Sequence, residues 1–76
     1  MEIHEIKLDA VISTAILLSV LRIIEKREVK IMRFVASVVN ENIAKGKIKI
    51  YLKTDEETLR LLKSEIEKAV DVIEVK

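Results

Sequence analysis

Few residues in this chain could carry out chemistry. The sequence contains one histidine, His4, and no cysteine, which excludes disulfides, thiolate metal sites and cysteine nucleophiles. No second histidine and no carboxylate at a metal-ligand spacing accompany His4, so we interpret it as a surface or strand-packing residue. The serines lack a histidine base, and a single glycine, Gly46, excludes a glycine-rich phosphate loop. We therefore predict a protein that is not an enzyme and has no catalytic residue, metal site or cofactor.

One short segment has the features of a ligand site. Residues 9–14 lead from an expected strand directly into an expected helix N-terminus, where unpaired N–H groups and the helix dipole attract a carboxylate. Two interpretations stay open. In the first, Ser13 only caps the helix. In the second, the N–H groups of Ser13, Thr14 and Ala15 also hold a ligand carboxylate, and Val11 and Ile12 line an apolar side pocket.

Length and charge limit the partners. The 76 residues are about half of the ~150 typical of a domain, so residues 1–76 form a single domain. Fourteen Lys and Arg and thirteen Asp and Glu alternate along the chain and give a net charge of +1. No basic block arises, and one Tyr, one Phe and no Trp leave little on which bases could stack, so nucleic acid is not expected as a partner.

Hydropathy and composition indicate whether the chain spans a membrane and where in the cell it is expected. The longest uncharged stretch, residues 10–21, has 12 residues, whereas a bilayer-spanning helix needs about 20. We therefore predict no membrane span. The first residues carry Glu2 and Glu5 before Lys7 and form no basic signal region, which indicates a cytoplasmic protein. The abundance of Lys, Glu and Ile resembles the composition of thermophile proteins.

The first half of the chain predicts a strand, a helix and a strand. Apolar and polar residues alternate over residues 6–10, as in a half-buried strand. Apolar residues then recur at helical spacing over residues 14–27, with Ser13 as N-cap. Residues 29–39 are β-branched and aromatic in both alternating sets, which predicts a strand with both faces covered.

The second half of the chain predicts a turn, a strand, a helix and a short last strand. Residues 40–46, including Gly46, predict a turn, and residues 47–53 alternate as the second arm of a hairpin. Thr54 and Glu57 form a capping-box pattern, which opens a helix. The apolar stripe of this helix is Leu59, Leu62, Ile66 and Ala69/Val70. Residues 72–75 form a short last strand.

This order of elements predicts an α+β, ferredoxin-like βαββαβ sandwich. Right-handed crossovers place both helices on one face of a four-stranded antiparallel sheet. The first and third strands are then central, and the second and fourth lie at the edges. The outer face would carry charges of both signs, with Glu5, Lys7 and Asp9 opposite lysines, and we expect it to stay in water and not to stack against a second copy.

The second strand predicts a homodimer. It lies at an edge, yet it has none of the prolines or dense lysines that protect free edges, and the first helix has a wider apolar arc than one sheet can bury. Antiparallel pairing of two second strands, with the first helices side by side, would cover both. The expected interface residues are Leu18, Ile23, Ile31, Met32, Phe34 and Val35.

Two stretches resemble a known family. Residues 20–27, VLRIIEKR, followed by the strand of residues 29–31, are similar to the VLR-containing pattern of the short ACT-type small subunits of acetolactate synthase. Residues 61–72, LLKSEIEKAVDV, resemble the LL…VDV ending of the same subunits. With the order of elements, the resemblance extends over nearly the whole chain.

The resemblance implies a regulatory ACT-like domain without a cofactor. Such a domain pairs with another copy or with a thiamine-dependent catalytic subunit, and it can sense a branched-chain amino acid at the loop between the first strand and helix, here residues Asp9 to Thr14. The family loop usually contains Pro-Gly, whereas this one reads Val11-Ile12-Ser13. The family usually has a glycine after the first helix, and this chain has Glu28 at that position. The alternative is a stand-alone oligomerisation module of the same fold without a small-molecule ligand.

Overall fold

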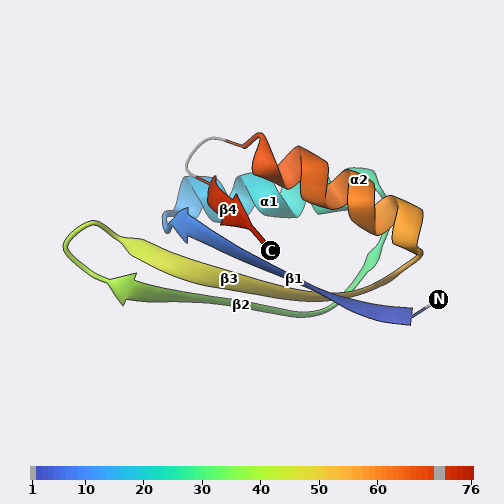
Figure 1. Ribbon diagram of the computed structural model, residues 1–76, viewed down its shortest axis with the longest axis horizontal. Helices are drawn as coiled ribbons and strands as arrows, with labels where there is room; N and C mark the ends of the chain where they lie inside the picture. Colours follow the sequence, from blue (N-terminus) through green and yellow to red (C-terminus); the bar gives the residue numbers. More distant parts are fainter. Residues whose placement is uncertain (1, 70–71) are drawn as a thin grey trace.

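The chain folds into one sheet covered on one face by two helices. The computed structural model describes residues 2–69 and 72–76. Its elements are β1 (Glu2–Val11), α1 (Thr14–Lys26), β2 (Lys30–Asn40), β3 (Lys45–Thr54), α2 (Glu56–Glu67) and β4 (Val72–Val75). The strand order is β2-β3-β1-β4 with antiparallel neighbours, and both helices lie on the same side of the sheet (Figure 1). The predicted ferredoxin-like fold class is confirmed.

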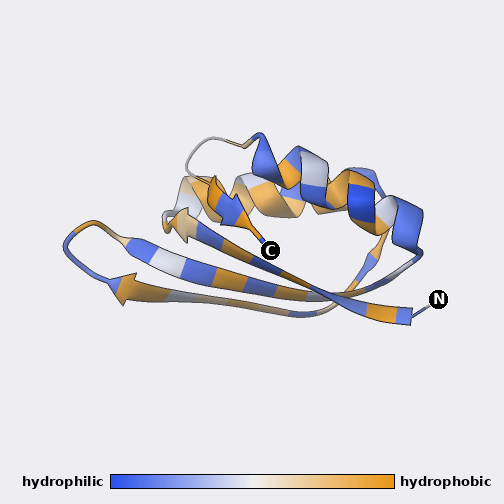
Figure 2. Cartoon of the chain, viewed as in Figure 1, coloured by the Kyte–Doolittle hydropathy of each residue, from blue (hydrophilic) through white to orange (hydrophobic). Residues whose placement is uncertain are grey.

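The core lies between the helices and the two central strands. β1 and β3 alternate apolar and polar residues along their length (Figure 2), so one face of each strand is apolar. The fully buried side chains are Ile6, Leu8 and Ala10 of β1, Ile48, Ile50 and Leu52 of β3, Ile16, Val20 and Ile24 of α1, and Leu62 and Ile66 of α2. Val70, the predicted last member of the α2 stripe, lies outside the described residues.

Both helices begin at a capping side chain. The Ser13 hydroxyl accepts the Ile16 N–H at 3.2 Å, as predicted for α1. The prediction that Thr54 caps α2 is wrong, because Thr54 is the buried last residue of β3 and pairs with Glu2. Asp55 takes that role and accepts the Thr58 N–H at 2.7 Å. This hydrogen bond, together with the Thr58 hydroxyl, lowers the pKa of Asp55.

The edge strand β2 differs from its prediction in two ways. Its register against β3 shifts between Ile31 and Arg33, and this bulge at Met32 places Ile31 on the helix side with Phe34, whereas strict alternation predicts Ile31 on the face of Val35. Nearly all of β2 is exposed, with only Phe34 half-buried. Within one chain, the expected cover over both faces is therefore missing.

Gly46, which the sequence predicts in the turn, lies inside β3. The turn occupies residues 41–44, and Gly46 pairs with Ala10 on one side and Val38 on the other. A Cβ at position 46 would lie 2.1 Å from the Ser37 carbonyl oxygen and 2.6 Å from Ile12 Cγ1. The φ angle of Gly46 is not positive, so its backbone conformation alone does not require glycine. Glycine is required because the neighbouring backbone approaches too closely for a Cβ.

Two non-glycine residues adopt the left-handed backbone conformation. Ala44 in the hairpin turn and Glu28 after α1 both have φ of 54°, a conformation that is strained for any residue with a Cβ. Glu28 is the position at which the resembling family has glycine. The Arg27 side chain, next to it, forms an ion pair with Glu65 of α2, which ties the end of α1 to the second helix.

The hairpin offers a matched test of these two backbone arguments. We expect Gly46→Ala to destabilise the fold by about 1–3 kcal/mol or more, because the new methyl group meets the fixed carbonyl of Ser37. We expect Ala44→Gly to leave stability unchanged or raise it by up to ~1 kcal/mol, since it removes left-handed strain. Urea unfolding followed by circular dichroism measures both. A Gly46→Ala variant as stable as the wild type would contradict the account of Gly46.

Candidate functional site

The loop between β1 and α1 is held at both ends by backbone hydrogen bonds. The Ile12 N–H donates to the Ala44 carbonyl at 2.7 Å, which joins the loop to the hairpin turn. The Ser13 carbonyl accepts the Leu17 N–H at 3.2 Å, and its hydroxyl accepts the Ile16 N–H. These contacts fix the start of α1 relative to the sheet.

The first amides of α1 point out of the helix without helical partners. The N–H groups of Thr14 and Ala15 belong to the first turn, where no carbonyl precedes them in the helix, and both residues are exposed. No acidic residue occupies that first turn. Because the positive end of the helix dipole adds to these donors, the site is suited to an anion such as a carboxylate.

The structure brings only part of the predicted ligand site together. Ser13, Thr14 and Ala15 lie at the start of the helix, and the half-buried Ile12 packs against the core beside them. Asp9 and Val11 alternate onto the opposite, outer face of the sheet. There the Asp9 carboxylate lies 3.6 Å from Lys76 Nζ.

The predicted interface residues form two groups. Four of them are exposed: Leu18 (46%) on α1, and Ile31 (36%), Met32 (45%) and Val35 (36%) on β2. Ile23 and Phe34 are half-buried and pack against the core. Four further apolar residues in the same region are exposed but are not among the expected interface residues, namely Leu21, Val38, Val39 and Ile43. Val38 and Val39 belong to the valine-rich run of residues 35–39 in β2, and this run of the sequence is the signal that could have identified them.

A second candidate region is the outer face of the sheet, which points away from the helices. The strand register places eight cations on this face: Lys7, Lys30, Arg33, Lys45, Lys47, Lys49, Lys53 and Lys76. Among the described residues, three side-chain carboxylates share it: Glu5, Asp9 and Glu74. This face is therefore strongly basic, although the whole chain carries a net charge of only +1. The period of two along a strand gathers lysines that alternate with apolar residues in the sequence.

Two of the three carboxylates on the outer face already have partners. Glu5 lies 3.4 Å from Lys7 Nζ and opposite Tyr51. The hydrogen bond from the Tyr51 hydroxyl lowers the pKa of Glu5 and raises that of Tyr51, and the charge of Lys7 lowers the Glu5 pKa further. Asp9 is paired with Lys76.

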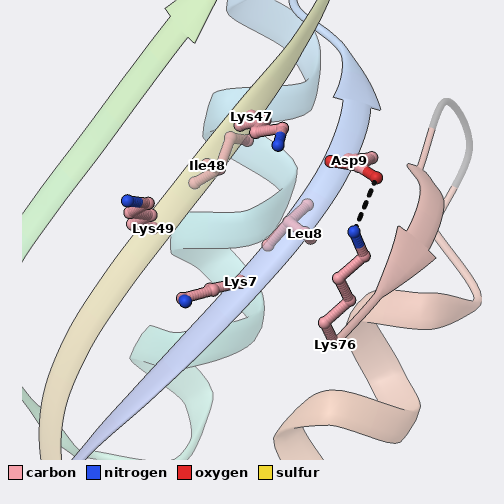
Figure 3. A pocket seen from close by; sticks show the side chains of 7 residues that line it. All are labelled: Lys7, Leu8, Asp9, Lys47, Ile48, Lys49 and Lys76. Atoms are coloured by element: carbon pink, nitrogen blue, oxygen red, sulfur yellow. Dashed lines mark ion pairs between the residues drawn. The ribbon is translucent and has the colours of Figure 1, made fainter.

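The outer face is hollowed where β1, β3 and the C-terminal residue meet. The hollow has a volume of about 260 Å³ and is lined by Lys7, Leu8, Asp9, Lys47, Ile48, Lys49 and Lys76. Figure 3 shows the four lysines arranged around it, with Asp9 turned toward Lys76. A second hollow of about 320 Å³ lies near the hairpin and is lined by Asp9, Val39, Asn40, Lys45, Gly46 and Lys47.

The described part of the chain shows no cluster of metal ligands and no helix that could span a membrane. Within residues 2–69 and 72–76, no three His, Cys, Asp or Glu side chains gather as metal ligands. His4 faces the helix side of β1, is half-buried and pairs with Leu52. Neither helix, over the same described residues, has the length and apolar character needed to cross a membrane.

Comparison with solved structures identifies the fold. The small subunit of acetolactate synthase from Thermotoga maritima superposes on 100% of this chain with a TM-score of 0.83 and 17% sequence identity. The ACT domain of GTP pyrophosphokinase from Chlorobium tepidum gives a TM-score of 0.80 at 13% identity, over 97% of this chain and 94% of that domain. A homoserine dehydrogenase from Thiobacillus denitrificans gives 0.80 at 18% identity over 97% of this chain. The chain has the ACT fold.

These similarities concern architecture alone. No model of a known protein family and no curated protein sequence matches the chain. The chain spans 47% of the acetolactate synthase small subunit and 16% of the homoserine dehydrogenase. It therefore matches only part of these longer proteins, and nearly the whole of the isolated ACT domain.

Proposed function

We propose that this chain is a non-catalytic regulatory domain that forms a homodimer through β2 and α1 and binds an amino acid at the start of α1. The observation that carries the proposal is the exposed apolar surface of β2 and α1. The ACT fold supports it, since all of this chain superposes on 47% of an acetolactate synthase small subunit. The sequence resemblance to the short small subunits points to a branched-chain amino acid and to a thiamine-dependent catalytic subunit as a further partner.

The dimer follows from the state of β2. An edge strand presents unpaired N–H and C=O groups, and free edges in soluble proteins are usually protected by charges or proline. The middle and end of β2 instead expose Val35, Val38 and Val39, the last of these 68% accessible. Antiparallel pairing with the β2 of a second copy would satisfy the backbone groups and extend the sheet to eight strands. Leu18 and Leu21 of α1 would then meet their counterparts.

The dimer can be tested by placing a charge on each face of β2. We expect the wild type to sediment as a dimer at micromolar concentration. Phe34→Lys on the helix side should shift it toward monomer because a buried ammonium group without a partner is costly. Val35→Lys on the outer side should do so because each copy adds a cation at the paired edge, next to Lys49, and like charges on neighbouring strands are destabilising. Tyr51→Lys, on the outer face of the central strand β3, is the matched control and should leave the dimer intact. A monomeric wild type, or a dimer that neither β2 substitution weakens, would contradict the proposal.

The amino-acid site is proposed at the amides of Ser13, Thr14 and Ala15. The ligand carboxylate would accept hydrogen bonds from these groups, and Ile12 would contact the ligand side chain. Neither of the two hollows described above is lined by residues 12–15. We infer that a second copy would supply the remaining wall of a site that forms only in the dimer.

Thr14→Pro removes one proposed donor with little disturbance of the helix. Proline suits the first helical position, and Ser13 before it is extended, with φ of −152° and ψ of 164°, as a residue before proline requires. We expect one or more branched-chain amino acids to raise the melting temperature of the wild type. At a concentration of 100 times its Kd, such a ligand raises the free energy of unfolding by about 2.7 kcal/mol. The Thr14→Pro variant should fold and lose that response, whereas Thr14→Ala, which keeps the N–H, should retain it.

A stand-alone oligomerisation module is the second candidate function. The absence of glycine from residues 9–15 favours it, because no position there permits unusually close backbone approach to a ligand. The same thermal-shift series distinguishes the two functions. A dimer that responds to none of the proteinogenic amino acids supports the module and contradicts the amino-acid site.

The proposed catalytic partner requires its own test. A pull-down with the acetolactate synthase catalytic subunit of the same genome, followed by measurement of its activity with and without this chain, would detect a regulatory complex. We expect binding and a changed response to branched-chain amino acids. An unchanged enzyme that does not bind the chain would restrict the proposal to self-association.

A further inference from the structure

The outer face of the sheet carries more positive charge than the fold requires. The core lies entirely on the other side, so the outer side chains need only be polar. Over residues 2–69 and 72–76, eight cationic and three carboxylate side chains nevertheless occupy this face. The two proposals above involve the β2 edge and the start of α1, and neither uses the lysines of β1, β3 and the C-terminus.

Two pairs of like charges oppose each other on this face. Lys7 pairs directly with Lys49 across β1 and β3, and Lys30 pairs with Lys53 across β2 and β3. Directly opposed side chains have Cβ atoms about 4.5–5.5 Å apart, and like charges at this position are destabilising. An anion bound between the ammonium groups would turn the repulsion into attraction.

The lysines around the hollow are only partly neutralised. In the described part of the chain, Lys7 pairs with Glu5 and Lys76 pairs with Asp9, whereas Lys47 and Lys49 have no carboxylate within ion-pair distance. Lys47 lies opposite Asp9 in the ladder, but the Asp9 carboxylate is turned to Lys76 (Figure 3). Positive charge therefore remains on the β3 side of the hollow.

We propose that this hollow, bordered by Lys7, Lys47, Lys49 and Lys76, binds a small anion that carries two linked phosphate groups. Lys47 and Lys49 project from the same face two residues apart, about 7 Å along β3, and Lys7 faces Lys49 across the ladder. Adjacent phosphate groups can contact both positions at once, and charge-assisted hydrogen bonds to ammonium groups are among the strongest. The volume of about 260 Å³ accommodates a diphosphate.

Nucleic acid is a less suitable occupant of the same face. The outer face has one aromatic ring, Tyr51, whose hydroxyl is hydrogen-bonded to Glu5. Binding of single strands generally combines a basic groove with several stacking side chains. A free diphosphate needs no stacking, so it fits the residues present.

The probe is inorganic pyrophosphate, titrated calorimetrically into the full chain at low and at physiological ionic strength. We expect saturable binding with one site per chain, stronger than that of orthophosphate. The variant Lys7→Gln with Lys49→Gln should weaken binding by roughly tenfold for each lysine removed. Its stability should stay close to that of the wild type, because the loss of the Lys7–Glu5 ion pair is offset by the removal of an opposed like-charge pair. Arg60→Gln with Lys68→Gln changes the net charge equally on the helix side, and it should leave the Kd within about twofold, as expected for distant exposed charges.

The outcomes separate a specific site from general attraction. Saturable pyrophosphate binding that is lost only in the outer-face variant supports the proposal. It is overturned if pyrophosphate does not saturate, or if the helix-side variant loses affinity equally. It is also overturned if a single-stranded oligonucleotide or poly-L-glutamate binds this face while pyrophosphate does not. The proposed dimer and amino-acid site are not affected by any of these results.

Discussion

The alternation of side chains along β1 and β3 is the constraint on which the structure depends. A strand places successive residues on opposite faces, so Ile48, Ile50 and Leu52 must face the helices once one of them does. The lysines between them must then face water. The apolar core and the basic outer face therefore both result from one pattern. A shift of either strand by one residue would turn its apolar side chains outward and its polar side chains toward the helices.

The same constraint explains why β2 is unusual. The register gives β2 an apolar helix side and a mostly polar outer side, yet nearly all of the strand is exposed and it lies at the edge of the sheet. The hairpin of β2 and β3 extends past the helices (Figure 1), and Val39 and Ile43 near its end are exposed, with 68% and 59% of their surface accessible in the described structure. The proposed dimer supplies what β2 lacks, and it places the start of α1 where a second copy can complete a ligand site.

Much of the fold could be predicted because it depends on local pattern. Periodicity located all six elements, and the strand-to-helix junction identified Ser13 as a cap. Thr54 was misassigned because sequence cannot show that a strand runs one residue further and leaves Asp55 to cap the helix. The bulge at Met32 and the tight contact at Gly46 depend on neighbouring strands. The sequence predicts an outer face with charges of both signs, but its excess of cations depends on Lys30, Arg33 and Lys76, whose places on this face only the structure shows. The conclusion that interspersed charges leave no basic surface therefore does not hold for strands.

Amide hydrogen exchange along β2, measured at several protein concentrations, tests most directly the claim that this strand pairs with a second copy. Amides that point to the open edge of an isolated chain exchange quickly, whereas amides paired across a dimer exchange only when it dissociates. The account predicts protection of β2 amides that decreases on dilution, while the central strands β1 and β3 stay protected throughout. Edge amides of β2 that exchange quickly at every concentration would contradict it.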